Sequence, residues 1–558
     1  MPSIWFGLFC LGLLLILQRR WKFNQLRARM PPGPPGGLLG DNRLDISRKA
    51  PWKTFKQWND LYGPVASFFL GSRPTIVLGT VEAATDLLEK RGDIYSSRPP
   101  NKLVNDVYTH GMRGIGMPYG QKWRRWRTLQ QSALSIQGSA NYRPLQTLES
   151  SIFLKDVLGA KDSEEIQSYM KRSSLFTVYG HQATQFTLRF AISVTICVAY
   201  GRRIERLDDN FVVANQQVES FFLKLTMPGQ IVDLVRNMSP PMSSSSTPNE
   251  RYHSSPSSGI YQWLDFQFKR PLQWFRYEVD RQREYATRVF TTALEAVKSQ
   301  IAQDTAQPSM ATHALQKQEE FGMNDTEIAY ALSAPWSAGV STTLAAIEVA
   351  ILAMLYNPDV MRKAQAELDR AVGRTRIPDF RDFDALPYLQ AVIKEALRWR
   401  PIAHVGFPHA VIQDDEYKGM FIPKGSTVIA NIHTITSDPA VFPDPDLFKP
   451  ERFLESSDPR LTNYNLSFGF GRRICPGMHI AQQSMFIVLA RILGAFDIVP
   501  VLGMDGKPDI QPSDDFTPGI VSRPANLKYR LTLRHHGAQE LIMLECERAE
   551  TELSAWTS

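Results

Sequence analysis

The residues best suited to chemistry lie in one loop near the carboxyl end of the chain, Phe468–Gly477, which contains Cys475. A single cysteine is most often an inert core residue, so its neighbours decide how it is interpreted. Glycines let a backbone pass close to a flat group and turn amide donors toward the sulfur, and arginines add positive charge. The loop contains both kinds of residue: Gly469, Gly471, Gly477, Arg472 and Arg473. Because Pro476 can begin a helix whose amino end favours an anion, we expect the loop to lower the pKa of the Cys475 thiol and hold a thiolate.

At these residues the chain resembles the cytochrome P450 superfamily, whose haem-binding loop reads F-x-x-G-x-R-x-C-x-G. Every fixed position is matched, by Phe468, Gly471, Arg473, Cys475 and Gly477. The resemblance implies a haem b cofactor whose iron takes Cys475 as its axial ligand, which favours cleavage of a bound O–O bond. The further loop residues that it implies as cofactor contacts are Phe468, Gly469, Arg473 and Gly477.

Two more motifs follow the family's pattern in the family's order. Glu395-Ala-Leu-Arg398 matches E-x-x-R, and Pro450–Phe453 matches P-E-R-F. Alone, an acid and a base at i and i+3 are common on solvated helix faces. Together the motifs imply a buried triad of Glu395, Arg398 and Arg452 that fixes the loop carrying Cys475. Its role is structural, and losing one partner of such a buried set costs about 3–5 kcal/mol.

A basic aromatic segment, Trp123-Arg-Arg-Trp-Arg127, places Trp123 and Arg127 on one helix face. Without a cofactor, such a helix is more often a solvated surface. The family's W-x-x-x-R motif implies instead that both side chains donate to a haem propionate, and His409 occupies the usual place of a second propionate donor. The remaining basic residues are expected to face outward, either toward an acidic reductase or simply toward solvent: Lys122, Arg124 and Arg125.

The segment Ala338-Gly-Val-Ser-Thr-Thr343 lies inside an apolar helix predicted from about residue 324 to 355 and resembles the family's A/G-G-x-D/E-T-T. The resemblance implies that Gly339 opens the helix for dioxygen and that Thr342 relays protons. Ser341 stands where the family has an acid. Pro335 removes the amide that would bond the Ala331 carbonyl and predicts a kink one turn upstream. A Ser-Thr-Thr run within a helix is otherwise an ordinary set of hydroxyls bonded back to the helix.

Aliphatic and aromatic residues are expected to form the wall of the substrate pocket, which favours an apolar substrate. By their position relative to the family, these are Val104, Val107, Ala334, Ala338, Val405, Phe407, Pro518 and Ile520.

The elements that position these residues are mainly helical. Extended stretches are predicted at 65–70 and 75–78, helices over most of the chain to about Arg400, and a last helix from about Met478 to Phe496. No interdomain linker interrupts residues 37–535. The chain is therefore expected to be mainly α with a small β portion, a single haem-thiolate domain with the cytochrome P450 fold, followed by a tail at 536–558.

Composition excludes several other classes of protein. The 558 residues are 43% hydrophobic and 21% charged, as in a large globular protein and unlike a disordered or polytopic membrane protein. A net charge of +7 is too small over this length to predict a nucleic-acid partner. The four cysteines are far apart, without the spacing of a disulfide framework or a zinc site.

Residues 1–21 are predicted to form an uncleaved signal-anchor helix. An uncharged apolar run at 4–17 precedes a basic cluster that includes Arg19, Arg20 and Lys22. Basic residues after the run place the following body in the cytosol, and the run's length suits the thin endoplasmic reticulum membrane. A cleaved signal peptide is the alternative, but no small-x-small cleavage site follows the run. Residues 22–36 are basic and then proline-rich, which predicts a stiff hinge.

Two segments do not match this pattern. Residues 239–259 are rich in serine and proline, which is typical of low-complexity disorder. Residues 173–188 interrupt what otherwise reads as one apolar helix through Phe190 to Tyr200. This second segment is either a tolerated surface loop or a translated intron of the gene model.

The resemblance implies a monooxygenase of the endoplasmic reticulum membrane that oxidises an apolar small molecule with dioxygen. Electrons would come from NADPH through the flavins of cytochrome P450 reductase. The sequence near Val405 and Ile422 resembles that of fungal microsomal members of the family, which modify secondary metabolites. Two alternatives stay open. One is a haem-thiolate isomerase or dehydratase without net oxygen insertion, which Ser341 favours, and the other is a non-catalytic haem-binding protein.

Overall fold

The computed structural model describes residues 23–37, 41–159, 183–226 and 258–556, together with Gln18 and Trp21. The predicted membrane segment at 4–17 lies outside these residues, as does most of the two atypical segments. The ends of both segments are nevertheless helical, since 183–188 lie in α9 (Ala183–Tyr200) and 258–259 begin α12 (Ser258–Ala302). The first segment therefore overlaps the start of α9, which corrects the expectation that the helix resumes after Leu188.

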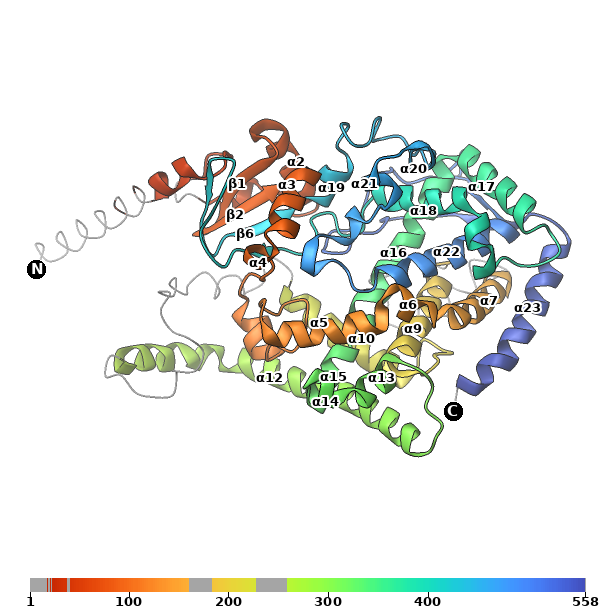
Figure 1. The fold of residues 1–558 in the computed structure, drawn as a ribbon, viewed down its shortest axis with the longest axis horizontal. Coiled ribbons are helices and arrows are strands. Elements are labelled where there is room, and N and C mark those ends of the chain that lie inside the picture. The colour runs from red at the N-terminus through yellow and green to blue at the C-terminus, as the bar shows by residue number, and fades with distance from the viewer. Residues whose placement is uncertain are drawn as a thin grey trace, which may run out of the picture.

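Helices make up most of the described chain, as the sequence predicts, and the small main sheet lies at one end of the body beside α2 (Pro51–Tyr62) and α3 (Val81–Ala84) (Figure 1). The longer helices are α2 (Pro51–Tyr62), α5 (Gln121–Leu134), α7 (Arg143–Gly159), α9, α10 (Asn210–Thr226), α12, α15 (Asp325–Leu332), α16 (Ala334–Tyr356), α17 (Pro358–Ala371), α18 (Pro387–Trp399), α22 (Met478–Ala495) and α23 (Gly537–Leu553). Shorter helices are α3 (Val81–Ala84), α4 (Gly92–Tyr95), α6 (Ile136–Ala140), α13 (Met310–Gln316), α14 (Gln318–Phe321), α19 (Ile432–Thr436), α20 (Arg452–Glu455) and α21 (Pro459–Thr462). Single 3-10 or π-helical turns are η1 (Arg43–Asp45), η2 (Thr85–Lys90), η3 (Lys102–Tyr108), η4 (Phe380–Ala385), η5 (Leu466–Phe468), η6 (Gly471–Arg473) and η7 (Ser554–Trp556).

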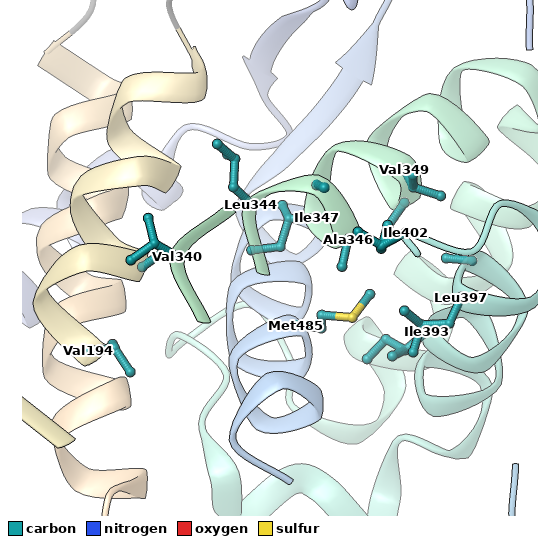
Figure 2. Packing of buried hydrophobic residues seen from close by; sticks show 14 of the residues in the cluster. Val194, Val340, Leu344, Ala346, Ile347, Val349, Ile393, Leu397, Ile402 and Met485 are labelled. Carbon is teal, nitrogen blue, oxygen red and sulfur yellow. The ribbon is translucent and has the colours of Figure 1, made fainter. Parts of the chain in front are cut away.

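Helix α16 is the centre of the core because it is apolar on all sides, a pattern that requires burial all round. Every residue from Thr343 to Leu355 is buried. Figure 2 shows side chains of α16 among those of α9, α18 and α22: Val340, Leu344 and Ile347 among Val194, Ile393, Leu397 and Met485. Among the described residues, α15 and α16 together form the one helical stretch long and apolar enough to cross a membrane, but 78% of its most apolar window is buried inside the protein, as in a core helix.

A break separates α15 from α16 at Ser333, with Pro335 in the first turn of the second helix. The helix is thus interrupted just before Pro335, in the region where the sequence predicts a kink. The Ala331 carbonyl accepts a hydrogen bond of 2.9 Å from the side-chain amide of Gln130, which belongs to α5. A side chain of another helix thus supplies the donor that proline lacks.

The main sheet brings together two segments that are far apart in the sequence, residues 65–78 and 409–430. Its four strands lie in the order β1 (Val65–Leu70), β2 (Arg73–Leu78), β6 (Thr427–Ala430) and β3 (His409–Ala410). Strands β2 and β6 are parallel and the other neighbours are antiparallel, so the register places His409 opposite Val428. Two small antiparallel pairs complete the sheets: β4 (Asp415–Tyr417) with β5 (Met420–Ile422), and β7 (Phe496–Val499) with β8 (Arg530–Leu533).

The segment expected as a tail at 536–558 contains helix α23, which packs against α7. Its Cys546, Ala549 and Leu553 are buried in one cluster with apolar residues of α7 and with Cys197 of α9. An ion pair of 2.6 Å between Lys155 and Glu550 also joins the two helices. The described part of this segment therefore belongs to the folded body.

Candidate active site

The loop that carries Cys475 contains the turns η5 and η6 and ends at helix α22. The Cys475 amide donates to the Phe468 carbonyl at 2.9 Å, which closes the loop. Gly471 has a φ of +58°, and a β-carbon there would lie 2.1 Å from the Leu88 carbonyl oxygen, so the loop requires glycine. At Gly469, whose φ is +85°, a β-carbon would meet nothing within 4 Å. The loop thus packs tightly at Gly471 and leaves open space at Gly469.

Burial raises the pKa of the Cys475 thiol above its ordinary value. The Gly477 amide and the Arg127 guanidinium act in the opposite direction without reversing it. The expected lowering of this pKa does not occur in the protein alone, because the effect of burial outweighs that of these two groups. Arg472, which was expected to add positive charge, pairs with Asp93 at 2.6 Å. A metal ion that binds the sulfur would remove the proton by itself.

Three guanidinium groups gather near this loop, and all three donate to main-chain carbonyls. Arg473 donates to the carbonyls of Ser96, Gly114 and Met117 at 2.7–3.2 Å. Arg98 donates to those of Ile115, Phe407 and Pro408 at 2.8–3.1 Å. Arg127 donates to the Ile474 carbonyl at 2.6 Å, and its Nε is buried with no partner in the described part of the chain.

These three groups carry the same charge and repel one another. Within the described residues no carboxylate pairs with them, so this repulsion is not offset. Burial, followed by the charges of Arg98 and Arg127, lowers the pKa of Arg473 to about 8. Burial lowers the pKa of Arg98 to about 10. Positive charges held together out of water are costly unless an anion joins them. The two propionates of haem b are such anions, so the residues present fit the cofactor that the resemblance implies.

Arg98 is the functional residue that the sequence reasoning missed. It stands in Ser97-Arg98-Pro99-Pro100, where the following proline favours extended backbone, and this segment bridges to β3 through Ser97 and Ala410. Nothing in the sequence indicates that this one arginine, among 63 basic residues, points inward.

The two predicted propionate donors besides Arg127 have different surroundings. The Arg473 guanidinium lies over the Trp123 ring, 4.2 Å from its centre. His409 Nδ1 is 2.9 Å from the Tyr95 carbonyl oxygen, so this nitrogen carries the hydrogen. Burial, aided by the charge of Arg98, lowers the pKa of His409 to about 3. In the neutral ring Nε2 carries no hydrogen and can only accept a hydrogen bond. The predicted donation from His409 to a propionate therefore requires a second proton, on Nε2.

The triad of Glu395, Arg398 and Arg452 is brought together as one buried set. Arg398 binds both oxygens of Glu395 at 2.7 and 2.8 Å, and Arg452 Nε approaches Oε1 at 3.3 Å. The amide of Lys449 donates to the same Oε1 at 2.8 Å. The same helix is tied to the cysteine loop, because the Ser467 hydroxyl donates to the Leu397 carbonyl at 2.9 Å.

On α16, Thr342 donates its hydroxyl to the Ala338 carbonyl of its own helix. Gly339 does not open α16, which is continuous through this residue, and the expected opening is wrong. A β-carbon at Gly339 would lie 2.7 Å from the Thr195 methyl group of α9, so the glycine permits close packing of two helices. Ser341 and Thr342 are half-buried, in contrast to the buried residues from Thr343 to Leu355 that follow them on α16.

The eight predicted wall residues divide into two groups. Val104 is buried in a cluster with Tyr108, Leu225 and Val279, and Val405 packs against the aromatic cluster beside the main sheet. Val104 is covered by its neighbours, which corrects its prediction as a wall residue. Val107 and Ala334, half-buried like Val405, also pack against buried clusters. The residues of the second group are exposed and available to contact a substrate: Ala338, Phe407, Pro518 and Ile520.

The basic residues of α5 that were expected to face outward differ from one another. Lys122 lies 3.8 Å from Glu327 of α15, and Arg125 donates to the Gly322 carbonyl. These two therefore hold α5 against α14 and α15. Arg124 lies over the Tyr119 ring and stays exposed.

Comparisons with known proteins agree with this geometry. A family model described as cytochrome P450 matches residues 31–531. The chain is similar to cytochrome P450 monooxygenase 58 of Postia placenta, with 34% identity over 531 residues that cover 94% of this chain and 92% of that protein. It is 32% identical to cytochrome P450 monooxygenase aneD of Aspergillus aculeatus over 95% of this chain and 93% of that protein. A zebra fish cytochrome P450 solved with abiraterone covers 87% of this chain and 100% of its own at a TM-score of 0.64 and 21% identity, which indicates the same fold.

Proposed function

The chain belongs to the cytochrome P450 family and is a monooxygenase, and we propose that it oxidises an apolar small molecule with electrons that cytochrome P450 reductase delivers from NADPH through its flavins. The observation that carries this proposal is a set of three guanidinium groups near Cys475, one buried (Arg127) and two half-buried (Arg98 and Arg473), that have no carboxylate partner among the described residues. They supply the positive charge that the propionates of haem b require.

Cys475 would hold the haem iron as thiolate, and Arg98, Arg127 and Arg473 would hold the propionates. When bound, the haem supplies the iron at which dioxygen is activated. The thiolate donates electron density to that iron. The carbonyl partners of the three arginines fix the direction in which each guanidinium points.

Thr342 would hold and move a proton at its hydroxyl oxygen. The hydroxyl now donates to the Ala338 carbonyl, and a rotation about the side chain would release it toward the site. Ser341 offers a second hydroxyl, which can donate and accept but cannot store a proton near neutral pH. The proton supply therefore needs another group or ordered water.

The substrate would be an apolar molecule of fungal secondary metabolism. The accessible wall residues Ala338, Phe407 and Ile520 are apolar, which favours such a substrate. The curated relatives are fungal monooxygenases of similar length. Residues 4–17 would anchor the protein in the endoplasmic reticulum membrane, with the catalytic body in the cytosol.

The test is a screen of apolar compounds in membranes that contain the protein, reductase and NADPH, under dioxygen labelled with heavy oxygen. The proposal expects a product that gains one labelled oxygen atom. An isobaric or dehydrated product would instead support the isomerase or dehydratase alternative. A haem-loaded protein that turns over none of the compounds would favour the non-catalytic one.

A further inference from the structure

A polar cluster between α10, α15 and α16 has no role in the site described so far. The Ser337 hydroxyl of α16 donates to Oε2 of Glu219 at 2.9 Å. Arg113 pairs with the same oxygen at 3.0 Å. Arg113 is buried, and the Glu219 side chain is 19% exposed. A carboxylate of α10 is thus fixed against α16, one residue before Ala338.

The surroundings of this carboxylate contain few other ionisable groups. Burial raises the pKa of Tyr108 in η3, the charge of Arg113 acts in the opposite direction, and Glu219 adds a smaller rise. Tyr330 of α15 also lies within the field of Arg113. The Arg113 guanidinium lies over the Phe222 ring, 4.3 Å from its centre. The carboxylate therefore lies among aromatic side chains with one close cation.

Helical geometry connects this carboxylate to the proton-relay residues. Ser337 and Ser341 are four residues apart, so they share one face of α16 with β-carbons about 5–6 Å apart. One ordered water can bridge two hydroxyls over such a gap. Thr342 is the next residue but points to a neighbouring face of the helix, so a second ordered water is needed to join its hydroxyl to that of Ser341.

We propose that Glu219, acting through Ser337, supplies the protons that a carboxylate at position 341 would otherwise deliver. This rests on the proposed function. A proton that reaches Glu219 Oε2 passes to the Ser337 oxygen while the Ser337 hydroxyl gives its own hydrogen to the bridging water. The water gives one hydrogen to Ser341, Ser341 gives its own through a second water to Thr342, and the Thr342 hydroxyl gives its own hydrogen to an acceptor in the site. Glu219 ends ionised, each hydroxyl and each water ends with its original number of hydrogens, and no electron moves. Glu219 is a positioning residue, since it acts only through its neighbours.

The first test needs no substrate and uses carbon monoxide as the probe. Infrared difference spectra are recorded on the purified, haem-loaded protein between its oxidised form and its reduced, carbon monoxide-bound form. A carboxylate linked to the site by hydrogen bonds should contribute a band that Glu219→Gln removes and Ser337→Ala shifts. The control Glu278→Gln, in a half-exposed pair with Arg281 on α12, should leave the band unchanged. A Glu219→Gln spectrum identical to that of the parent would overturn the proposal.

The second test uses rescue to separate proton supply from a merely structural ion pair. The substrate is the compound identified by the labelled-oxygen screen, and the readout is hydrogen peroxide released per NADPH. Glu219→Gln and Ser337→Ala should release several-fold more peroxide, and Ser341→Asp added to Glu219→Gln should bring the ratio back to that of the parent. If the double variant stays as uncoupled as Glu219→Gln, the role is structural and the proposal fails.

The two proposals fail in different ways. If the parent makes no oxygenated product, the proposed function fails while the infrared band still decides whether Glu219 is linked to the site. Ser337→Ala keeps the ion pair between Arg113 and Glu219, so it tests the link even if Glu219→Gln does not fold.

Discussion

The loop around Cys475 and the middle of α16 are held in place in different ways. Around the cysteine, buried charges have several fixed partners, as when Arg473 binds three carbonyls and Arg398 binds both oxygens of Glu395. On α16, Thr342 bonds only within its own helix. Substitution of a residue with several buried partners leaves those partners without a hydrogen bond. Substitution of Ser341, the neighbour of a hydroxyl that bonds only within its own helix, does not. This explains why the cysteine loop matches its family completely while position 341 departs from it.

The largest effect is expected at the iron ligand. Cys475→His should abolish the red-shifted absorption band of the reduced carbon monoxide complex that thiolate ligation produces, even if haem stays bound, because imidazole donates less electron density. Monooxygenase activity should be lost with the band. The band and the haem content are measured on the same purified samples, and an unchanged band would remove Cys475 as the ligand.

The next effect concerns the buried triad. Glu395→Gln leaves Arg398 and Arg452 without their carboxylate and should lower the free energy of unfolding by about 3–5 kcal/mol. Denaturant unfolding of the purified protein measures this loss. The control Glu278→Gln removes a half-exposed partner of Arg281 and should cost at most about 1 kcal/mol. Equal losses in the two variants would contradict the structural role of the triad.

On the α16 side, the substitutions should affect coupling while the fold is kept. Thr342→Ala should divert electrons to hydrogen peroxide and slow product formation, since general acid catalysis is worth about 10²–10⁴ in rate. Ser341→Ala should be milder, and Ser341→Asp should match or improve the parent. The measurement is product formed per NADPH consumed. An unchanged ratio and turnover in Thr342→Ala would move the isomerase or dehydratase alternative ahead.

The sequence predicted the elements and residues whose roles are encoded locally. The break before Pro335 follows from one missing amide, and helix α22 begins and ends within a residue of its expected limits. Arg98 could not be found in this way, because its burial depends on the carbonyls of Ile115, Phe407 and Pro408, which only the tertiary fold brings together.

Two other differences have the same physical origin. The close approach of α9 to Gly339 depends on packing between helices, which no local pattern records. Helix α23 lies beyond residue 531, where the family model ends, so the resemblance carried no information about it. Which residues of α23 are buried depends on the apolar face of α7 that this helix covers, so their burial could not be predicted from the sequence of α23 alone.

The smallest predicted effect links the two regions through Gln130, which lies on α5 together with Trp123 and Arg127. Gln130→Leu leaves the Ala331 carbonyl with only the Ser333 amide as a donor and should cost about 0.5–1.5 kcal/mol of unfolding free energy. Pro335→Ala restores a backbone amide that can bond this carbonyl, so Gln130→Leu should cost much less in that background.

Unfolding free energies of the four proteins in this double-mutant cycle give the coupling between the two positions directly. An equal cost of Gln130→Leu with proline or alanine at position 335 would mean that the side-chain amide does not replace the missing backbone donor. A positive coupling would mean that the helix carrying the proposed propionate donors also fixes the break that precedes the hydroxyls of α16. Helix α5, which packs beside the cysteine loop, would then stabilise the start of α16, the helix in which Thr342 bonds only to its own backbone.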